Sequence, residues 1–255
     1  MRRFLSAVMA VALFGAFLDA PSVARAAEIA LPEGHWSFQG IFGTFDHAAA
    51  RRGFDVYKDV CSACHSMNLL HYRNLEAIGF SEDEAKTIAA GFQVQGEPDD
   101  AGDVKDRPAK LSDAFKAPFA NEQAARAANN GALPPDLSVI IKARKGGADY
   151  VHALLSGYGE APADVKLQEG MNYNKYFPGH QIAMPQPLSD NSVTYADGTP
   201  ATLDQEARDV TTFLAWAGEP ELEERHFTGV KTILFLIVFT ALLYAVKRKV
   251  WAAVH

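Results

Sequence analysis

The sequence predicts a mainly α-helical domain with long ordered loops, followed by one C-terminal transmembrane helix. Three observations lead to this prediction. Several segments carry apolar residues at intervals of three and four, and two of them begin at a capping signal. Long stretches rich in glycine, proline and asparagine separate these segments, and ordered loops of that length usually enclose a ligand or serve a function. Near the C-terminus, an uncharged apolar run ends at a basic cluster.

Residues 1–26 have the composition of a secretory signal peptide. Two arginines precede an apolar run, and Ala24 and Ala26 provide the small residues of a cleavage site. An uncleaved anchor helix is the alternative, but the run is short for spanning a bilayer. We therefore expect residues 27–226 to form a domain outside the cytoplasm, in an oxidising compartment.

The first two helices of this domain are expected on either side of residue 70. A helix is expected at residues 48–61, because Phe54 and Tyr57 then lie on one apolar face. This helix ends at the only segment of the chain that contains cysteine. Ser81 and Glu84 form a capping box, in which each side chain binds the backbone amide of the other residue, and a helix is expected to follow.

Three further helices are expected, at 122–129, at 148–157 and after Thr202. Glycines or prolines end each of them. Thr202 and Gln205 form a second capping box. The apolar face of the helix that follows consists of Ala207, Val210, Phe213, Leu214 and Ala217.

The stretches between these helices are expected to be irregular. Residues 96–108 form a polar, acidic turn region, and residues 169–187 are rich in Asn, Tyr, Pro and Gly. Within 193–200, Asp197 and Gly198 are typical of a hairpin turn.

Residues 227–246 predict a transmembrane helix. The part from Thr232 on has no charged residue, and the whole segment gives about 30 Å of helix, the thickness of a bilayer core. A buried core helix is the alternative, but three basic residues follow at once. The positive-inside rule then places the tail, 247–255, in the cytoplasm and the domain on the opposite side.

The only two cysteines, Cys61 and Cys64, stand three apart, and His65 follows directly. A redox disulfide, half of a metal site and covalent attachment of haem are the three interpretations. A thioredoxin-type pair opens a helix after a strand, whereas here a helix precedes the pair. A zinc site needs a fourth ligand, and the sequence has no second ligand pair. C-x-x-C-H is the attachment signature of c-type haem, in which both thiols bind the porphyrin and the histidine binds the iron.

The second axial ligand of such a haem must come from further along the chain. Met67 is too close to the attachment segment to reach the opposite face of the ring. Met184 stands in an Ile-Ala-Met-Pro segment, whose prolines stiffen a loop suited to cross that face. Met171 is the second choice, and His180 is a rival of another ligand class. A thioether ligand favours ferrous iron and raises the reduction potential, which suits electron transfer.

Arg126 is the candidate partner of the haem propionates, because these anions usually need a cation or a hydrogen-bond donor. A solvated arginine on a helix is the alternative. The segment 27–228 is strongly acidic, although the net charge of the whole chain is only −7. Such a surface argues against nucleic acid as a partner and suits a basic protein partner, although plain solubility would explain it equally well.

Five segments, taken together and in order, resemble the cytochrome c1 family of bacterial respiratory chains. They are WSFQGIFGTFD, RGFDVYKDVCSACHSM, ARAANNGALPPDLS, YFPGHQIAMPQPL and DGTPATLDQEARDVTTFLAWAGEPE. The resemblance covers about residues 34–250. The C-x-x-C-H motif alone would indicate only a c-type cytochrome, whereas the NNGALPPDLS and IAM segments are far more specific.

The resemblance implies a class I cytochrome c core with one covalent haem c, in a subunit of ubiquinol–cytochrome c oxidoreductase. The subunit is not an enzyme on its own. It takes electrons from the Rieske iron–sulfur subunit, passes them to a soluble or membrane-anchored cytochrome c, and assembles with cytochrome b. The axial ligands fall on His65 and Met184, the propionate partner on Arg126, and Pro134 close to the haem. The expected place is the inner membrane of a bacterium, with the haem domain in the periplasm.

One feature departs from many bacterial members, which carry an extra disulfide that this chain lacks. Its loops must therefore be held by packing and prolines. Acidic residues that could steer a basic electron carrier are Glu97, Asp99, Asp100 and Asp103. The alternatives to the whole interpretation are a membrane-anchored monohaem cytochrome of a terminal oxidase, an exported thiol oxidoreductase and a haem enzyme such as a peroxidase.

Overall fold

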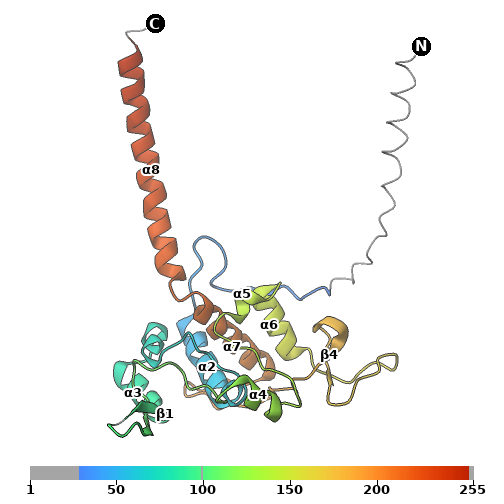
Figure 1. Ribbon diagram of the computed structural model, residues 1–255. Helices are drawn as coiled ribbons and strands as arrows, with labels where there is room; N and C mark the ends of the chain where they lie inside the picture. Colours follow the sequence, from blue (N-terminus) through green and yellow to red (C-terminus); the bar gives the residue numbers. More distant parts are fainter. Residues whose placement is uncertain (1–28, 99, 253–255) are drawn as a thin grey trace, which may run out of the picture. The chain divides into compact units, whose positions relative to one another are not determined.

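The computed structural model describes residues 29–98 and 100–252, and all elements discussed below belong to the unit Leu31–His255 (Figure 1). The predicted signal peptide lies outside the described residues. The domain is mainly helical, as the sequence predicts, with long irregular connections between short helices.

Two helices form the centre of the domain. Helix α2, His47–Asp59, begins where the side chain of Asp46 accepts a hydrogen bond from a backbone amide of the first turn. Helix α7, Leu203–Gly218, packs directly on α2. The predicted apolar faces of both helices are buried. Gly53 lies at the crossing, where a Cβ would collide with the backbone of α7, so that only glycine allows this approach.

A buried ion pair also joins the two helices. The guanidinium of Arg52 on α2 donates from Nε and Nη2 to the two carboxylate oxygens of Asp209 on α7, at 2.8 and 3.0 Å. The Asp209 side chain is fully buried. Arg52 also donates to Asp197, at 2.9 Å. Because an uncompensated buried charge is costly, this pair favours a single register between the helices.

Six shorter helical elements lie between α2 and the long loop of residues 169–187. They are η1 Cys61–Ala63, η2 Tyr72–Ile78, α3 Glu82–Ala90, α4 Glu122–Ala128, α5 Ile140–Ala143 and α6 Gly147–Ser156. The predicted capping box is present at α3, where Ser81 and Glu84 bind each other's backbone amides. At α7 only half of the predicted box forms: Thr202 accepts from the amide of Gln205, but the Gln205 side chain donates to Asp209 instead.

The strands are short and differ from the expectation. Within the acidic turn region, β1 Gln93–Pro98 and β2 Val104–Pro108 form an antiparallel hairpin that the polar composition did not indicate. The long loop predicted to be irregular contains the two-residue strands β3 Asn172–Tyr173 and β4 Gln181–Ile182, joined through η3 Pro178–His180.

The predicted hairpin within 193–200 is wrong. Gly198 donates its amide to the carbonyl of Tyr195, at 3.2 Å, and has a φ of 76°, so a turn is present. The described residues on either side of it form no strand. The carboxylate of Asp197 binds Arg52 and the amide of Thr199, which holds the segment against α2 rather than against a second strand.

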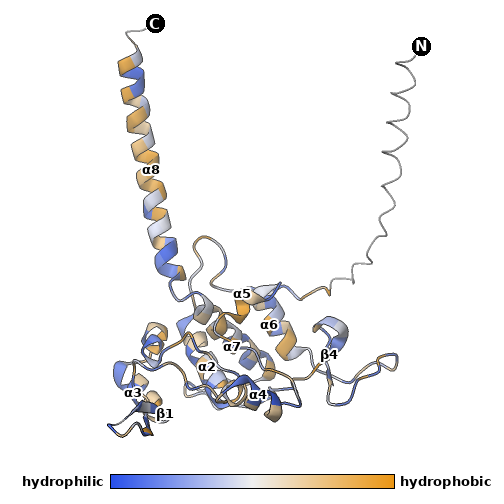
Figure 2. Cartoon of the chain, in the orientation of Figure 1, coloured by the Kyte–Doolittle hydropathy of each residue, from blue (hydrophilic) through white to orange (hydrophobic). Residues whose placement is uncertain are grey.

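Helix α8, Leu222–Trp251, contains the predicted transmembrane segment and begins five residues before it. By length and composition it is able to cross a membrane, and it is the one helix among the described residues that meets this criterion. Figure 2 shows an apolar band along its middle and polar residues towards both ends. Glu223 fixes the first turn of α8 to the domain, because its carboxylate accepts a hydrogen bond from the amide of Phe45, at 2.6 Å.

Candidate haem-binding site

The cysteine motif forms a single tight turn directly after α2. The amides of Cys64 and His65 both donate to the carbonyl of Cys61, at 3.1 and 2.9 Å. The hydroxyl of Ser62 donates to the carbonyl of Lys58, at 2.7 Å, which ties the turn to the last turn of α2. The helix thus stops just before the first cysteine, and both thiols and the imidazole belong to one rigid backbone segment.

The imidazole of His65 is oriented by a second segment of the chain. Its Nδ1 lies 2.8 Å from the carbonyl oxygen of Pro135. A carbonyl only accepts, so Nδ1 carries the proton and Nε2 keeps the free lone pair. Burial lowers the pKa of His65, and this outweighs the opposite effects of the Pro135 hydrogen bond and of Asp136. The ring is therefore neutral near pH 7, in the form that ligates a metal.

The carboxylate of Asp136 holds the two segments together. It accepts hydrogen bonds from the Ser66 hydroxyl and from the amides of Asn68 and Ser138, each at 2.8 Å. Burial raises the pKa of this carboxyl, but the hydrogen bonds outweigh burial and hold the pKa below its usual value. Asp136 therefore fixes the distance between the cysteine turn and the Pro135 carbonyl that orients His65.

We expect Asp136→Ala to lower the free energy of unfolding by about 2–4 kcal/mol, because three donors lose a charged acceptor. Denaturant unfolding of the purified protein measures this value. The matched control is Asp100→Ala, an exposed acidic residue, for which the change should stay within about 0.5 kcal/mol. Equal effects of the two substitutions would contradict the role assigned to Asp136.

The same carboxylate predicts a pH dependence. A carboxyl whose pKa is lower in the folded state stabilises the fold fully above its unfolded pKa of about 3.9, and the contribution is lost as the pH falls through the folded pKa. Stability of the parent protein should therefore decrease below about pH 4. Asp136→Asn should flatten this decrease in unfolding curves measured at successive pH values.

The Cys61 thiol lacks the lowered pKa of a redox-active cysteine. Both cysteines are free in this structure, with Cys61 half-buried and Cys64 exposed. Burial, together with the neighbouring Cys64, raises the pKa of the Cys61 thiol to about 12. A thiol oxidoreductase needs a lowered pKa, because the thiolate is the nucleophile. Among the described residues there is also no group of three or more His, Cys, Asp and Glu side chains that could hold a metal ion.

Met184 lies on a separate loop, two residues after the end of β4. Its carbonyl accepts hydrogen bonds from the hydroxyl of Tyr158, at 3.1 Å, and from the side-chain amide of Asn172, at 3.4 Å. The thioether-bearing residue is half-buried. No hydrogen bond joins this loop to the turn of residues 61–65 within the part of the chain that the structure describes.

The two rival ligands lie in the same region as Met184. Met171 is half-buried and precedes β3. His180 has a φ of 59°, and its ring stacks on Tyr173 with a centroid distance of 6.0 Å. Its Nδ1 is buried without a hydrogen-bond partner. Burial alone therefore does not decide among the three candidates.

Arg126 and Pro134 lie on the segment between the cysteine turn and the Met184 loop. Arg126 is exposed near the end of α4, and its Nη1 donates to the carbonyl of Gly131, at 3.1 Å. Gly131 has a φ of 85°, a conformation that favours glycine. Most guanidinium donors of Arg126 remain available for an anion. Pro134 is half-buried and precedes the proline whose carbonyl binds His65.

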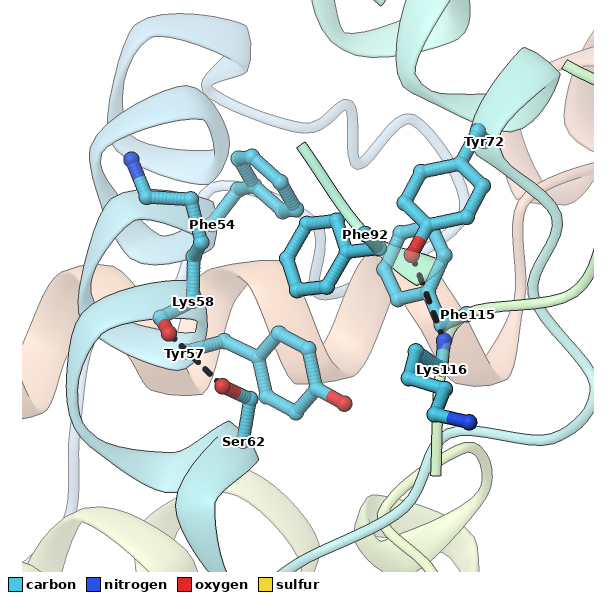
Figure 3. Close-up of a pocket in the computed structure, with 8 residues that line it drawn as sticks. All are labelled: Phe54, Tyr57, Lys58, Ser62, Tyr72, Phe92, Phe115 and Lys116. Carbon is cyan, nitrogen blue, oxygen red and sulfur yellow. Dashed lines mark hydrogen bonds between the residues drawn. The ribbon is translucent and has the colours of Figure 1, made fainter. Parts of the chain in front are cut away.

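An aromatic pocket beside the cysteine turn is not the haem site. Figure 3 shows rings from α2 and from later segments that surround a small space, with Ser62 at its edge. The cavity measures about 10 Å³, which is about the space of one water molecule. The aromatic residues around it have a structural role. The hydroxyl of Tyr57 donates a hydrogen bond to the carbonyl of His65, at 3.3 Å, and so stabilises the cysteine turn.

The acidic residues singled out in the sequence lie on the β1–β2 hairpin. Glu97 is exposed on β1, and Asp100 and Asp103 are exposed in the connection between the strands. Asp99 lies outside the described residues. The hairpin thus presents these side chains to solvent, where they can act on a partner at a distance.

Comparison with known proteins identifies the family of this chain. A mainly α domain whose C-x-x-C-H turn presents two thiols and an oriented imidazole defines a protein of the c-type cytochrome class. The chain belongs to the cytochrome c1 family, whose model matches residues 36–254. The fold class expected from the sequence is thereby confirmed.

Three relatives illustrate the similarity. The chain is 49% identical to "Cytochrome c1 1, heme protein, mitochondrial" of Arabidopsis thaliana, over 97% of this chain and 83% of the relative. It is 51% identical to the "Cytochrome b-c1 complex catalytic subunit, mitochondrial" of Candida albicans, over 88% and 78%. It is 45% identical to cytochrome c1 of Rhodospirillum rubrum, over 98% and 96%.

Proposed function

We propose that this chain is the haem-bearing electron-transfer subunit of a cytochrome b-c1 complex. The carrying observation is the cysteine turn of a cytochrome c1 family member, in which the Pro135 carbonyl leaves Nε2 of His65 free for iron. Relatives named as heme proteins and as a subunit of the b-c1 complex support the cofactor and the assembly. The subunit carries out no reaction on an organic substrate and is not an enzyme on its own.

Four residues would hold the haem. Cys61 and Cys64 would each form a thioether by adding the S–H across one vinyl group, and His65 and Met184 would bind the iron through nitrogen and sulfur. When bound, the haem supplies a one-electron change between Fe(III) and Fe(II). A thioether ligand stabilises the ferrous state and so raises the reduction potential.

Two further residues are proposed to shape the surroundings of the haem. Arg126 would donate hydrogen bonds to the propionates through the guanidinium N–H groups that do not bind the Gly131 carbonyl. Pro134 would pack against the ring, since it precedes the segment that contacts His65.

The electron would arrive from the Rieske iron–sulfur subunit and leave to a soluble or membrane-anchored cytochrome c, with cytochrome b as the membrane partner. The exposed carboxylates of Glu97, Asp100 and Asp103 support a basic electron acceptor, whose association they would accelerate at low salt.

The proposed topology is a single pass through the inner membrane of a bacterium. Residues 1–26 would be removed on export, and residues 27–226 would lie in the periplasm. Residues 227–246 would span the bilayer and residues 247–255 would stay in the cytoplasm. The apolar composition of α8 and the basic residues at its end support this orientation.

Purification of the native protein from membranes tests the proposal. A pyridine haemochrome spectrum of c type and a mass that exceeds the polypeptide by one haem are expected. Cytochrome b and a Rieske protein should purify with it. A copper–haem oxidase in their place would identify a terminal-oxidase cytochrome, and carbon monoxide binding to the reduced protein would indicate an open iron site. Free titratable thiols without haem would contradict the proposal.

A further inference from the structure

The loop that enters α2 ends in an unusual turn. Gly43 donates its amide to the carbonyl of Gly40, at 3.2 Å, so that Ile41 and Phe42 are the two central residues of a β-turn. Their exposed fractions are 72% and 76%. Turn tips in water usually carry Gly, Pro, Asn, Asp or Ser. Two large apolar side chains at this position indicate a surface that is covered in the working protein.

The residues on both sides of the turn are fixed by hydrogen bonds and aromatic packing. The carbonyl of Ser37 accepts the amide of Thr44, at 3.0 Å, and the rings of Phe38 and Phe45 pack with a centroid distance of 5.2 Å. Trp36 is buried and donates to Asp149 of α6, at 2.6 Å. Other aromatic residues of the same loop pack into the core. The exposure of Ile41 and Phe42 is therefore not the result of a loop without a core.

The same turn is fixed to the beginning of α8. The ring Nδ1 of His226 lies 3.1 Å from the carbonyl oxygen of Gly43, which follows Phe42 directly. The next helix residue, Phe227, is 63% exposed. Figure 1 shows the loop beside the first turns of α8. The apolar turn thus lies beside the start of the helix whose following residues are apolar and exposed.

A lysine marks the depth of this surface. Lys231 lies one turn further along α8, and its Nζ is 3.7 Å from the ring centroid of Phe227, so the side chain points back towards the domain. A lysine near the end of a membrane span directs its ammonium towards the headgroups in this way. The headgroup region then lies at the level of Phe227, next to the residue that binds Gly43.

We infer that Ile41 and Phe42 insert into the bilayer interface and form a second membrane contact of the domain beside α8. The inference rests on the proposed membrane anchoring by α8. The occupant is the lipid surface rather than a protein, because the turn lies beside the exposed apolar helix and residues 39–43 carry no charge. Together, the start of α8 and the inserted turn would fix the tilt of the domain relative to the membrane.

Spin labelling of the full-length holoprotein in phosphatidylcholine nanodiscs tests this inference. A nitroxide is attached to Phe42→Cys, since the two natural thiols are bonded to haem. The ratio of collision rates with oxygen and with a water-soluble nickel chelate is expected to be several-fold higher than for Val104→Cys, an exposed apolar site on β2. A label at Leu243→Cys, in the middle of the span, reports the anchoring itself.

The labels at positions 42 and 243 test the turn and the anchor separately. A water-like label at position 42 with a lipid-like label at 243 overturns the inference and leaves the anchor intact, whereas water-like labels at both positions overturn the anchor as well. In the intact complex, a label at 42 that neither reagent reaches shows that another subunit covers the turn, and this also overturns the inference. If the labelled variant does not accumulate, Phe42→Trp replaces it, with stronger quenching by brominated lipid expected than for Val104→Trp.

Discussion

Replacing Met184 with leucine is expected to lower the reduction potential by roughly 0.1–0.3 V, well within the range of about 0.8 V that axial ligands set. The charge-transfer band between thioether sulfur and ferric iron, near the red end of the spectrum, should disappear. The reason is that leucine has no lone pair to replace the sulfur, which favours ferrous iron. A redox titration followed by absorption spectroscopy measures both quantities on one sample.

The control for this substitution is Met171→Leu, because Met171 is equally half-buried and precedes the strand that pairs with β4. Its spectrum and potential should match those of the parent protein. If Met184→Leu keeps the band and the potential, the ligand is another residue. Loss of both in Met171→Leu would assign that methionine, and their loss only in a His180 variant would change the ligand class.

The double substitution Cys61→Ala/Cys64→Ala is expected to abolish retention of haem in denatured protein and to leave little folded protein in membranes. Without the thioether bonds, only the axial ligands would hold the porphyrin. The cysteine turn connects α2 to the segment around Asp136, so the loss reaches the centre of the domain. Haem staining of denaturing gels and quantitative immunoblots of the membranes measure the two effects.

Ser62→Ala is the matched control, since Ser62 lies between the two cysteines. This substitution removes one hydrogen bond to Lys58 and leaves both thiols in place. It should retain haem fully and lose only about 1 kcal/mol of stability. Normal accumulation of a double variant that carries its full complement of covalently bound haem would refute the attachment of haem through these cysteines.

Helices were predictable wherever their signals are local. The capping box at Ser81 and the apolar stripe of α7 depend on residues within a few positions of one another, and both are present in the structure. The β1–β2 hairpin was missed because Gly96 and Pro98 are rare in strands, and its pairing is decided by partners from Val104 on. Helix α8 extends beyond the predicted span at both ends, where charged residues leave no apolar pattern to mark it.

The candidate site was only partly predictable for the same reason. The cysteine turn and its histidine are contiguous, so spacing alone identifies them. The residues that position the site were not singled out, because a tyrosine such as Tyr158 or an aspartate such as Asp136 has no distinctive pattern in the sequence. Only the fold brings Tyr158 to the carbonyl of Met184 and Asp136 to the segment after His65.

The sequence by itself determined the chemistry that this chain can offer: two thiols and an imidazole at fixed spacing, and an apolar helix long enough for a bilayer. Such features are covalent or local, so they do not depend on distant partners. Only the tertiary structure decided which nitrogen of the imidazole is free to bind a metal. The carbonyl of Pro135, 70 residues away from His65, selects the tautomer that leaves Nε2 free. Contacts between distant segments depend on packing of the whole chain, and no local pattern specifies them.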